Sequence, residues 1–251
     1  MKPLGLIVLS YLFSSVSPFA PPSHLKTRLP ALQMSAPPVE FEDAVVVGDP
    51  MFLDEEAMLA ARPDGALAKS EMIQIVKDAL LASGGIGLPE AMLAPDFSFE
   101  GPVVGPFSKT EFLDAIGRVD FKGGFSEFKN EFYGFSVDPL EGDRVWYTAR
   151  GRGINDGPFP TAELPATMKE VVNPPQVCSM TIDHATRRIK RYTIGYVVDR
   201  QVGNTGGLGG LYGIMYAIGR PLPFPEALPW RPSLPYQAFR TIGGFLGKLG
   251  S

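Results

Sequence analysis

Residues 93–116, LAPDFSFEGPVVGPFSKTEFLDAI, contain the pattern that decides the fold. Phe97 and Phe99 alternate with polar residues, which is typical of a β-strand that buries one face. Two Gly-Pro pairs follow and interrupt the strand. Ser108 then begins a helix, and Glu111, three residues later, completes a capping box. The stretch therefore predicts a half-buried strand, a turn and a helix.

Around this stretch, the sequence predicts helices first and long strands later. A short helical pattern covers residues 54–61, and a stronger helix begins at Ser70 and ends at Gly84-Gly85. Alternating apolar residues predict strands at 125–137, 144–153, 176–183 and 188–200. In the first of these strands, a bulge at Gly134 would return the apolar residues to the inner face. This order favours an α+β fold, with helices packed on one face of a strongly curved antiparallel sheet.

The chain of 251 residues has a formal net charge of −4, which is unevenly distributed. Residues 36–200 contain 16 Lys and Arg against 26 Asp and Glu, whereas residues 1–35 and 201–251 each have a net charge of +3. Because an acidic body repels phosphates, we expect no nucleic-acid partner. One cysteine and two histidines argue against a disulfide framework, a metal site or a His-based triad. We therefore expect no metal and no cofactor.

The first 35 residues have the pattern of a targeting sequence. Lys2 precedes an apolar run at 4–13 and then small residues, as in a signal peptide, and the run is too short to span a bilayer. The residues that follow are basic and contain no acid, which is typical of a transit peptide. The junction SPFAPP, with Phe19, resembles the bipartite presequences of algae with secondary plastids. This resemblance implies removal of residues 1–35 on import into the plastid, with the stroma as destination, and secretion is the alternative.

Residues 93–116 resemble the first strand and following helix of nuclear-transport-factor-2-like, or SnoaL-like, domains. The strand RRIKRYTIGYVVDR at 187–200 fits the same superfamily. The resemblance covers residues 54–200, with 36–53 as a linker and 201–251 as a Gly/Pro-rich C-terminal extension. It implies a cone-shaped fold with a ligand cavity between the concave sheet face and the helices. The superfamily includes ketosteroid-isomerase-like isomerases, polyketide cyclases, dehydratases and non-catalytic modules, so the fold by itself implies no reaction.

Alternation along the strands predicts which side chains face the implied cavity. The candidate ligand-binding residues are Phe128, Asn130, Phe132, Tyr147, Tyr192 and Tyr196. Tyrosine hydroxyls and an Asn amide can donate hydrogen bonds to a carbonyl or a developing oxyanion. Catalytic relatives use an inward Asp or His as a base, and no strand carboxylate is expected to face inward here. Core packing is the alternative role for the tyrosines, and a structural hydrogen bond is the alternative for Asn130.

The C-terminal extension combines a small-residue segment with a proline-rich arm. Gly209, Gly213 and Ala217 recur every four residues, which favours close helix packing over a phosphate loop. The segment either packs on the domain, closes the cavity mouth, joins two protomers or lies at a membrane surface. Prolines from 221 to 235 indicate an extended arm without helix, and apolar residues from 239 to 249 indicate a weak amphipathic helix.

Two functions are consistent with these patterns. The first is a SnoaL-like plastid protein that binds a small, largely apolar molecule in the cone, with isomerase- or cyclase-type chemistry as an extension of that role. The second is a non-catalytic module that forms a homodimer and contacts a protein partner or a thylakoid surface through its extension. The sequence leaves open whether the chain is an enzyme, because no catalytic base is evident.

Overall fold

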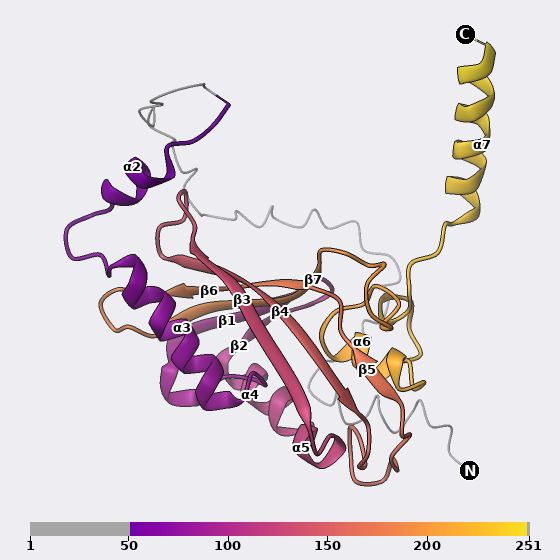
Figure 1. Cartoon of the computed structure of the whole chain (residues 1–251), viewed down its shortest axis with the longest axis horizontal. Helices are drawn as coiled ribbons and strands as arrows, with labels where there is room; N and C mark the ends of the chain where they lie inside the picture. The colour runs from indigo at the N-terminus through magenta and orange to yellow at the C-terminus, as the bar shows by residue number, and fades with distance from the viewer. Residues whose placement is uncertain (1–50, 250–251) are drawn as a thin grey trace, which may run out of the picture.

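The structure contains the helices and strands that the sequence pattern predicts up to residue 200, and adds short strands at 104–108 and 170–172 and a short helix at 121–124. The structure is a computed structural model that describes the backbone of residues 51–249 and the side chains of residues 51–242 (Figure 1). The expected presequence at 1–35 and most of the expected linker lie outside the described residues. In chain order, the elements are α2 (Glu55–Ala60), α3 (Lys69–Ser83), η1 (Glu90–Met92), β1 (Leu93–Gly101), β2 (Val104–Ser108), α4 (Lys109–Gly117), α5 (Phe121–Gly124), β3 (Phe128–Val137), β4 (Arg144–Ile154), β5 (Glu170–Val172), β6 (Gln176–Ile182), β7 (Ile189–Val197), α6 (Gly210–Ala217), η2 (Pro225–Ala227) and α7 (Leu234–Leu249).

Capping explains where the helices start. Ser108 and Glu111 form the predicted capping box of α4, in which the backbone N–H of Ser108 donates to the Glu111 carboxylate at 2.8 Å. Asp54 caps α2 by accepting a hydrogen bond from the N–H of Ala57 at 3.0 Å. The start of α3 differs slightly from the prediction, because the helix already begins at Lys69 and Ser70 is its second residue.

The strands form one seven-stranded, strongly curled sheet in the order β2-β1-β7-β6-β4-β3, with β5 paired to β4. Helices α3 and α4 lie on one side of this sheet (Figure 1), which confirms the α+β cone with helices on a curved sheet. The prediction of a purely antiparallel sheet is wrong at one position, since β1 and β7 pair in parallel. These two strands are far apart in the sequence, and no local pattern reports their relative direction.

Two glycine bulges set which side chains face inward. Gly134, at φ +68°, lies in a register shift between Tyr133 and Ser136 on β3, which confirms the predicted bulge. A second bulge, which was not predicted, lies on β7 around Gly195, at φ +85°: Thr193 pairs with Ser179, whereas Tyr196 pairs with Val177. The additional residue reverses the alternation, so the side chain of Tyr196 turns away from the cone.

The domain contains two hydrophobic cores. The first fills the cone between the sheet and α3 and α4, and includes Met72, Phe97, Phe112, Tyr147 and Met180. The second lies beside β5 and α5, and unites residues from segments that are distant in the sequence: Phe125, Phe159, Leu164, Val171, Ile214, Met215, Ile218, Leu222 and Ala227. The first half of the C-terminal extension therefore packs on the domain, which is one of the four alternatives that the sequence left open.

The small-residue pattern of the extension has a direct structural reason. A Cβ atom on Gly209 would lie 2.0 Å from the carbonyl oxygen of Gly195, so only glycine allows the start of α6 to approach β7. The prediction that the proline-rich arm is free of helix is wrong at two places, because the short 3₁₀ helix η2 (Pro225–Ala227) lies inside the arm and α7 begins at its end. α7 begins at Leu234, directly after Ser233, whose hydroxyl accepts from the N–H of Tyr236 at 3.3 Å. Pro235 is compatible with this start, because N–H groups in a first helical turn have no intrahelical acceptor.

Candidate functional site

Three polar side chains from adjacent strands meet inside the cone. Tyr147 on β4 pairs directly with Cys178 on β6, and Tyr192 on β7 pairs with Met180, two residues along the same strand. All three polar side chains are buried, with exposed fractions of 2% for Tyr147, 4% for Cys178 and 5% for Tyr192. Because the strands curl around them, their polar atoms lie in an otherwise apolar interior.

Aromatic rings enclose these polar groups. Tyr192 contacts Phe99 at a ring distance of 5.7 Å and Phe112 at 6.2 Å, with edge-on geometry in both pairs. Tyr147 stacks on Phe135 at 5.3 Å and meets Phe132 edge-on at 6.0 Å. The aromatic rings therefore fill the space around the two tyrosine hydroxyls and make it apolar.

The hydroxyl of Tyr147 is one of three buried side-chain oxygens in the described residues that have no hydrogen-bond partner, beside Asn173 Oδ1 and Thr181 Oγ1. It is buried and no group meets it in hydrogen-bond geometry, although the Tyr192 hydroxyl and the Cys178 thiol lie close enough to interact with it. Leaving a buried polar group unpaired costs about 1–3 kcal/mol, so such groups are rare and mark either strain or a place that a ligand or water fills. Burial raises the pKa of Tyr147 well above its usual value, and the neighbouring Tyr192 and Cys178 raise it further. The hydroxyl therefore stays protonated and can donate a hydrogen bond.

The neighbouring groups are also neutral at physiological pH. Burial raises the pKa of the Cys178 thiol to about 12, and burial together with Cys178 raises the pKa of Tyr192. None of the Asp and Glu side chains among residues 51–242 is buried. The described interior thus offers hydrogen-bond donors for a carbonyl or oxyanion, and no carboxylate that could act as a base there.

Asn130 and Phe128 have structural contacts of their own. Asn130 is half-buried on β3, and its amide donates to the carbonyl oxygen of Gly84 at 3.0 Å, so it ties β3 to the end of α3. Phe128 packs in the second core, where its ring meets Phe121 edge-on at 4.9 Å. The structure thus gives Asn130 the structural bond that was its alternative role.

Phe132 faces the cone as predicted, whereas Tyr196 does not. Phe132 faces the cone, where its ring contacts Tyr147. Tyr196 is 42% exposed, so the expectation that it faces inward is wrong, and the bulge at Gly195 is the reason. Of the six candidate residues, the structure brings together Tyr147, Tyr192 and Phe132. It adds to them Cys178, which pairs with Tyr147, and Phe112, which contacts Tyr192.

The outward face of the sheet has a separate polar cluster around Trp146. The Arg144 guanidinium lies 3.9 Å from the Trp146 ring centre, and the indole N–H donates to Asp138 at 2.7 Å. Arg144 also donates to Ser179 at 2.9 Å. Partial burial alone would raise the pKa of Asp138, but hydrogen bonds from Glu141, Trp146 and Leu140 outweigh it and lower the pKa. The contacts with Arg144 and Asp138 account for a Trp side chain on the outward face of the sheet, so no ligand is needed to explain it.

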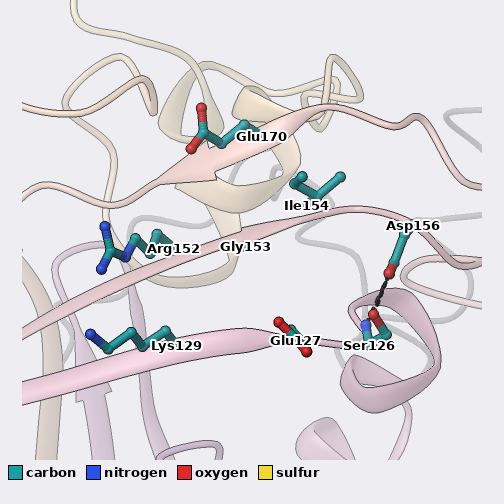
Figure 2. Close-up of a pocket in the computed structure, with 8 residues that line it drawn as sticks. All are labelled: Ser126, Glu127, Lys129, Arg152, Gly153, Ile154, Asp156 and Glu170. Carbon is teal, nitrogen blue, oxygen red and sulfur yellow. Dashed lines mark hydrogen bonds between the residues drawn. The ribbon is translucent and has the colours of Figure 1, made fainter.

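A groove of about 370 Å³ lies where β3 begins and β4 ends. Its lining residues are Ser126, Glu127, Lys129, Arg152, Gly153, Ile154, Asp156 and Glu170 (Figure 2). Ser126 donates to Asp156 through its N–H at 2.9 Å and through its hydroxyl, and the hydroxyl bond is the main reason for the lowered pKa of Asp156. The sequence analysis missed this groove, because Glu170 belongs to a three-residue strand that looks like a loop. Its mixed charges and exposed lining do not fit a small apolar ligand.

Residues 51–249 lack the features of a metal site and of a membrane-spanning helix. No group of three or more His, Cys, Asp or Glu side chains in that part of the chain is arranged to hold a metal ion. None of the helices described there combines the length and the hydropathy that a transmembrane helix needs.

Comparison with known proteins gives similarities only at the level of structure. No protein-family model and no curated protein matches the sequence. A protein from Jannaschia sp. CCS1, assigned as a SnoaL-like polyketide cyclase, matches with 19% identity and a TM-score of 0.43, over 64% of this chain and 99% of its own. A nuclear-transport-factor-2-like protein from Burkholderia thailandensis E264 matches with 16% identity and a TM-score of 0.35, over 51% and 90%.

A third similar structure has a bound small molecule. It is a protein with a ketosteroid isomerase-like fold from Catenulispora acidiphila DSM 44928, in complex with trimethylamine, and matches with 16% identity and a TM-score of 0.37, over 61% of this chain and 97% of its own. At these values, the fold assignment rests on the strand order, the curl of the sheet and the placement of α3 and α4. By these features, the described chain is an α+β cone with α3 and α4 packed on a strongly curled sheet, which is the architecture that the resemblance to nuclear-transport-factor-2-like domains implies.

Proposed function

We propose that the cone binds a small, largely apolar molecule that accepts a hydrogen bond from Tyr147. The observation that carries this proposal is the buried, unpaired hydroxyl of Tyr147. An acceptor on the ligand would remove the cost of that unpaired group, while the surrounding rings of Phe112, Phe132 and Phe135 would cover the apolar part of the ligand. Tyr192 supplies a second hydroxyl in the same interior.

Isomerase- or cyclase-type chemistry is a finer proposal on the same interior. Two neutral hydroxyls in an apolar surrounding can stabilise negative charge that develops on a carbonyl oxygen. A proton acceptor is the additional group that such a reaction needs, and the described interior has no carboxylate to provide it. Ligand binding therefore has more support than catalysis.

The test is mass spectrometry of small molecules that remain bound to the full chain after mild purification. We expect a retained apolar compound with a carbonyl or another acceptor, and a lower occupancy of that compound when Tyr147 is replaced by Phe. Tyr196→Phe is the matched control, because it removes the same hydroxyl from a side chain that is 42% exposed. Equal retention by the two variants would contradict the proposed role of Tyr147.

We also propose that the protein is a plastid protein of an alga with a secondary plastid. Support comes from the composition of residues 1–35 and from the SPFAPP junction. The test is a fusion of residues 1–40 to a fluorescent reporter, expressed in such an alga. Fluorescence in the stroma is expected, and secretion of the reporter would contradict the proposal.

A second function, as a dimerisation module, has support from the outward face of the sheet. Tyr133 on β3 and Tyr196 on β7 are 46% and 42% exposed. Exposed tyrosines of this kind are common in protein interfaces. Light scattering over a range of concentrations tests this function. A dimer that Tyr196→Arg dissociates would support it, and a monomer at all concentrations would contradict it.

A further inference from the structure

The C-terminal helix α7 exposes large apolar side chains to solvent. Leu234 is 80% exposed, Phe239 is 73% exposed and Ile242 is 59% exposed. The helix extends away from the sheet and from the other helices (Figure 1). Apolar side chains that are grouped in this way usually mark a surface that binds a partner.

The sequence of α7 indicates that this helix needs such a surface to form. Its sixteen residues include Gly243, Gly244 and Gly247. Each glycine inside a helix costs about 1 kcal/mol relative to alanine, and isolated helices of this length are marginal in water even with good helix formers. Burial of the apolar face is the contribution that can offset this cost.

The apolar and polar residues of α7 lie on opposite sides. Ala238, Phe239 and Ile242 follow the three-and-four spacing of one helix face. Gln237, Arg240 and Thr241 fall on the other side at 100° per residue. The helix is therefore amphipathic, with a cationic residue on its polar face.

The charge around α7 selects the partner. Residues 228–251 contain Arg231, Arg240 and Lys248 and no acidic residue, whereas residues 36–200 have a net charge of −10. The basic segment could pair with this acidic body, but the structure places α7 away from it (Figure 1). An anionic surface outside the molecule would attract the basic residues of this segment, and α7 is free to reach it because the helix lies away from the acidic body.

Aromatic residues at the start of α7 suit the boundary between lipid and water. Trp230 is 60% exposed, and its ring meets that of Tyr236 edge-on at 5.7 Å. The Arg200 guanidinium lies 5.4 Å from the Trp230 ring. Trp and Tyr side chains favour the headgroup region of a bilayer, because one end of each ring system is apolar and the other is polar.

We propose that α7 docks on the surface of a bilayer that contains anionic lipids, with Phe239 and Ile242 in the acyl-chain boundary and Arg240 toward the headgroups. The helix would lie in the plane of the surface and tether the domain to it. This inference is independent of ligand binding in the cone, because it uses none of the residues of that interior.

The experiment titrates the full chain with vesicles and follows the fluorescence of Trp230. Vesicles of phosphatidylglycerol and phosphatidylcholine, in a ratio of about three to seven, are compared with vesicles of phosphatidylcholine alone. The apolar run at 4–13 can bind vesicles by itself, so the signal must be local to α7. A blue shift that Trp230→Phe removes comes from Trp230, since the chain contains only two Trp residues. We expect this shift with the anionic vesicles, and no shift with them would overturn the proposal.

Matched variants separate insertion of the apolar face from attraction by charge. Ile242→Glu and Gln237→Glu add the same charge, one on each side of α7. We expect Ile242→Glu to weaken vesicle binding at least tenfold more than Gln237→Glu, since only Ile242 would leave the acyl region. Arg240→Gln is expected to weaken binding to the anionic vesicles about fivefold. Equal effects of the two Glu variants would overturn the proposal, as would a homodimer without vesicles that Ile242→Glu dissociates.

Discussion

Replacing Tyr147 by Phe should stabilise the protein, which is an unusual expectation for a buried residue. The change removes only a hydroxyl that is buried without a hydrogen-bond partner. The ring is 2% exposed and keeps its contacts with Phe132 and Phe135, at 6.0 Å and 5.3 Å. Since an unpaired buried polar group costs about 1–3 kcal/mol, we expect the free energy of unfolding to rise by about that amount. For a chain of this size, each kcal/mol corresponds to roughly 2–4 °C in the melting temperature.

Urea denaturation of the ligand-free protein, followed by circular dichroism, measures this change. The midpoint should rise while the slope against urea concentration stays the same, because the folded and unfolded chains keep their surfaces. Tyr196→Phe is the control, with an expected change below about 0.5 kcal/mol, as for most surface substitutions. A loss of 1 kcal/mol or more in Tyr147→Phe would refute the reasoning, because the hydroxyl would then have a stabilising partner, such as a buried water.

Three further expectations test the packing and the electrostatics. Gly209→Ala should lower the free energy of unfolding by about 1–3 kcal/mol, because its Cβ would collide with Gly195; Gly117→Ala, which meets no atom within 4 Å, should be neutral or stabilising in the same urea assay. The pKa of Asp138 is lower in the folded protein than in the unfolded chain, where it is about 3.9, so the ionised carboxylate stabilises the fold above that pH. This stability is lost as the pH falls through the folded pKa. Asp138→Asn should therefore lose less stability than the wild type between about pH 5 and pH 2. With its pKa at about 12, buried Cys178 should react with a chromogenic disulfide reagent at neutral pH far more slowly in the folded protein than in urea, and equal rates would show an open interior.

Features that depend on neighbouring residues in the sequence could be predicted from alternation, capping residues and glycines. Phe97 and Phe99 are buried as their alternation indicates, the capping box at Ser108 is present, and Gly134 is a bulge. Features that depend on distant residues could not be predicted in this way. Examples are the parallel pairing of β1 with β7 and the second core, to which the C-terminal extension contributes Ile214 and its neighbours.

The candidate site was predicted in part for the same reason. Alternation correctly placed Tyr147 and Tyr192 inside the cone, because both lie in stretches of regular strand pairing. It failed for Tyr196, because Gly195 was not recognised as a bulge. Asn130 was expected near the ligand, but its hydrogen bond to Gly84 depends on where α3 ends in space, which no pattern on β3 reports.

The central claim is that the cone holds a small apolar molecule through the hydroxyl of Tyr147. The most direct measurement is native mass spectrometry of the full chain, in which the wild type, Tyr147→Phe and Tyr196→Phe are purified in parallel. We predict that the wild type and Tyr196→Phe retain the same additional mass, and that Tyr147→Phe retains it with about two- to tenfold lower occupancy, the effect of one hydrogen bond. Spectra that show only the bare chain for all three proteins, or the same occupancy in all three, would contradict the claim.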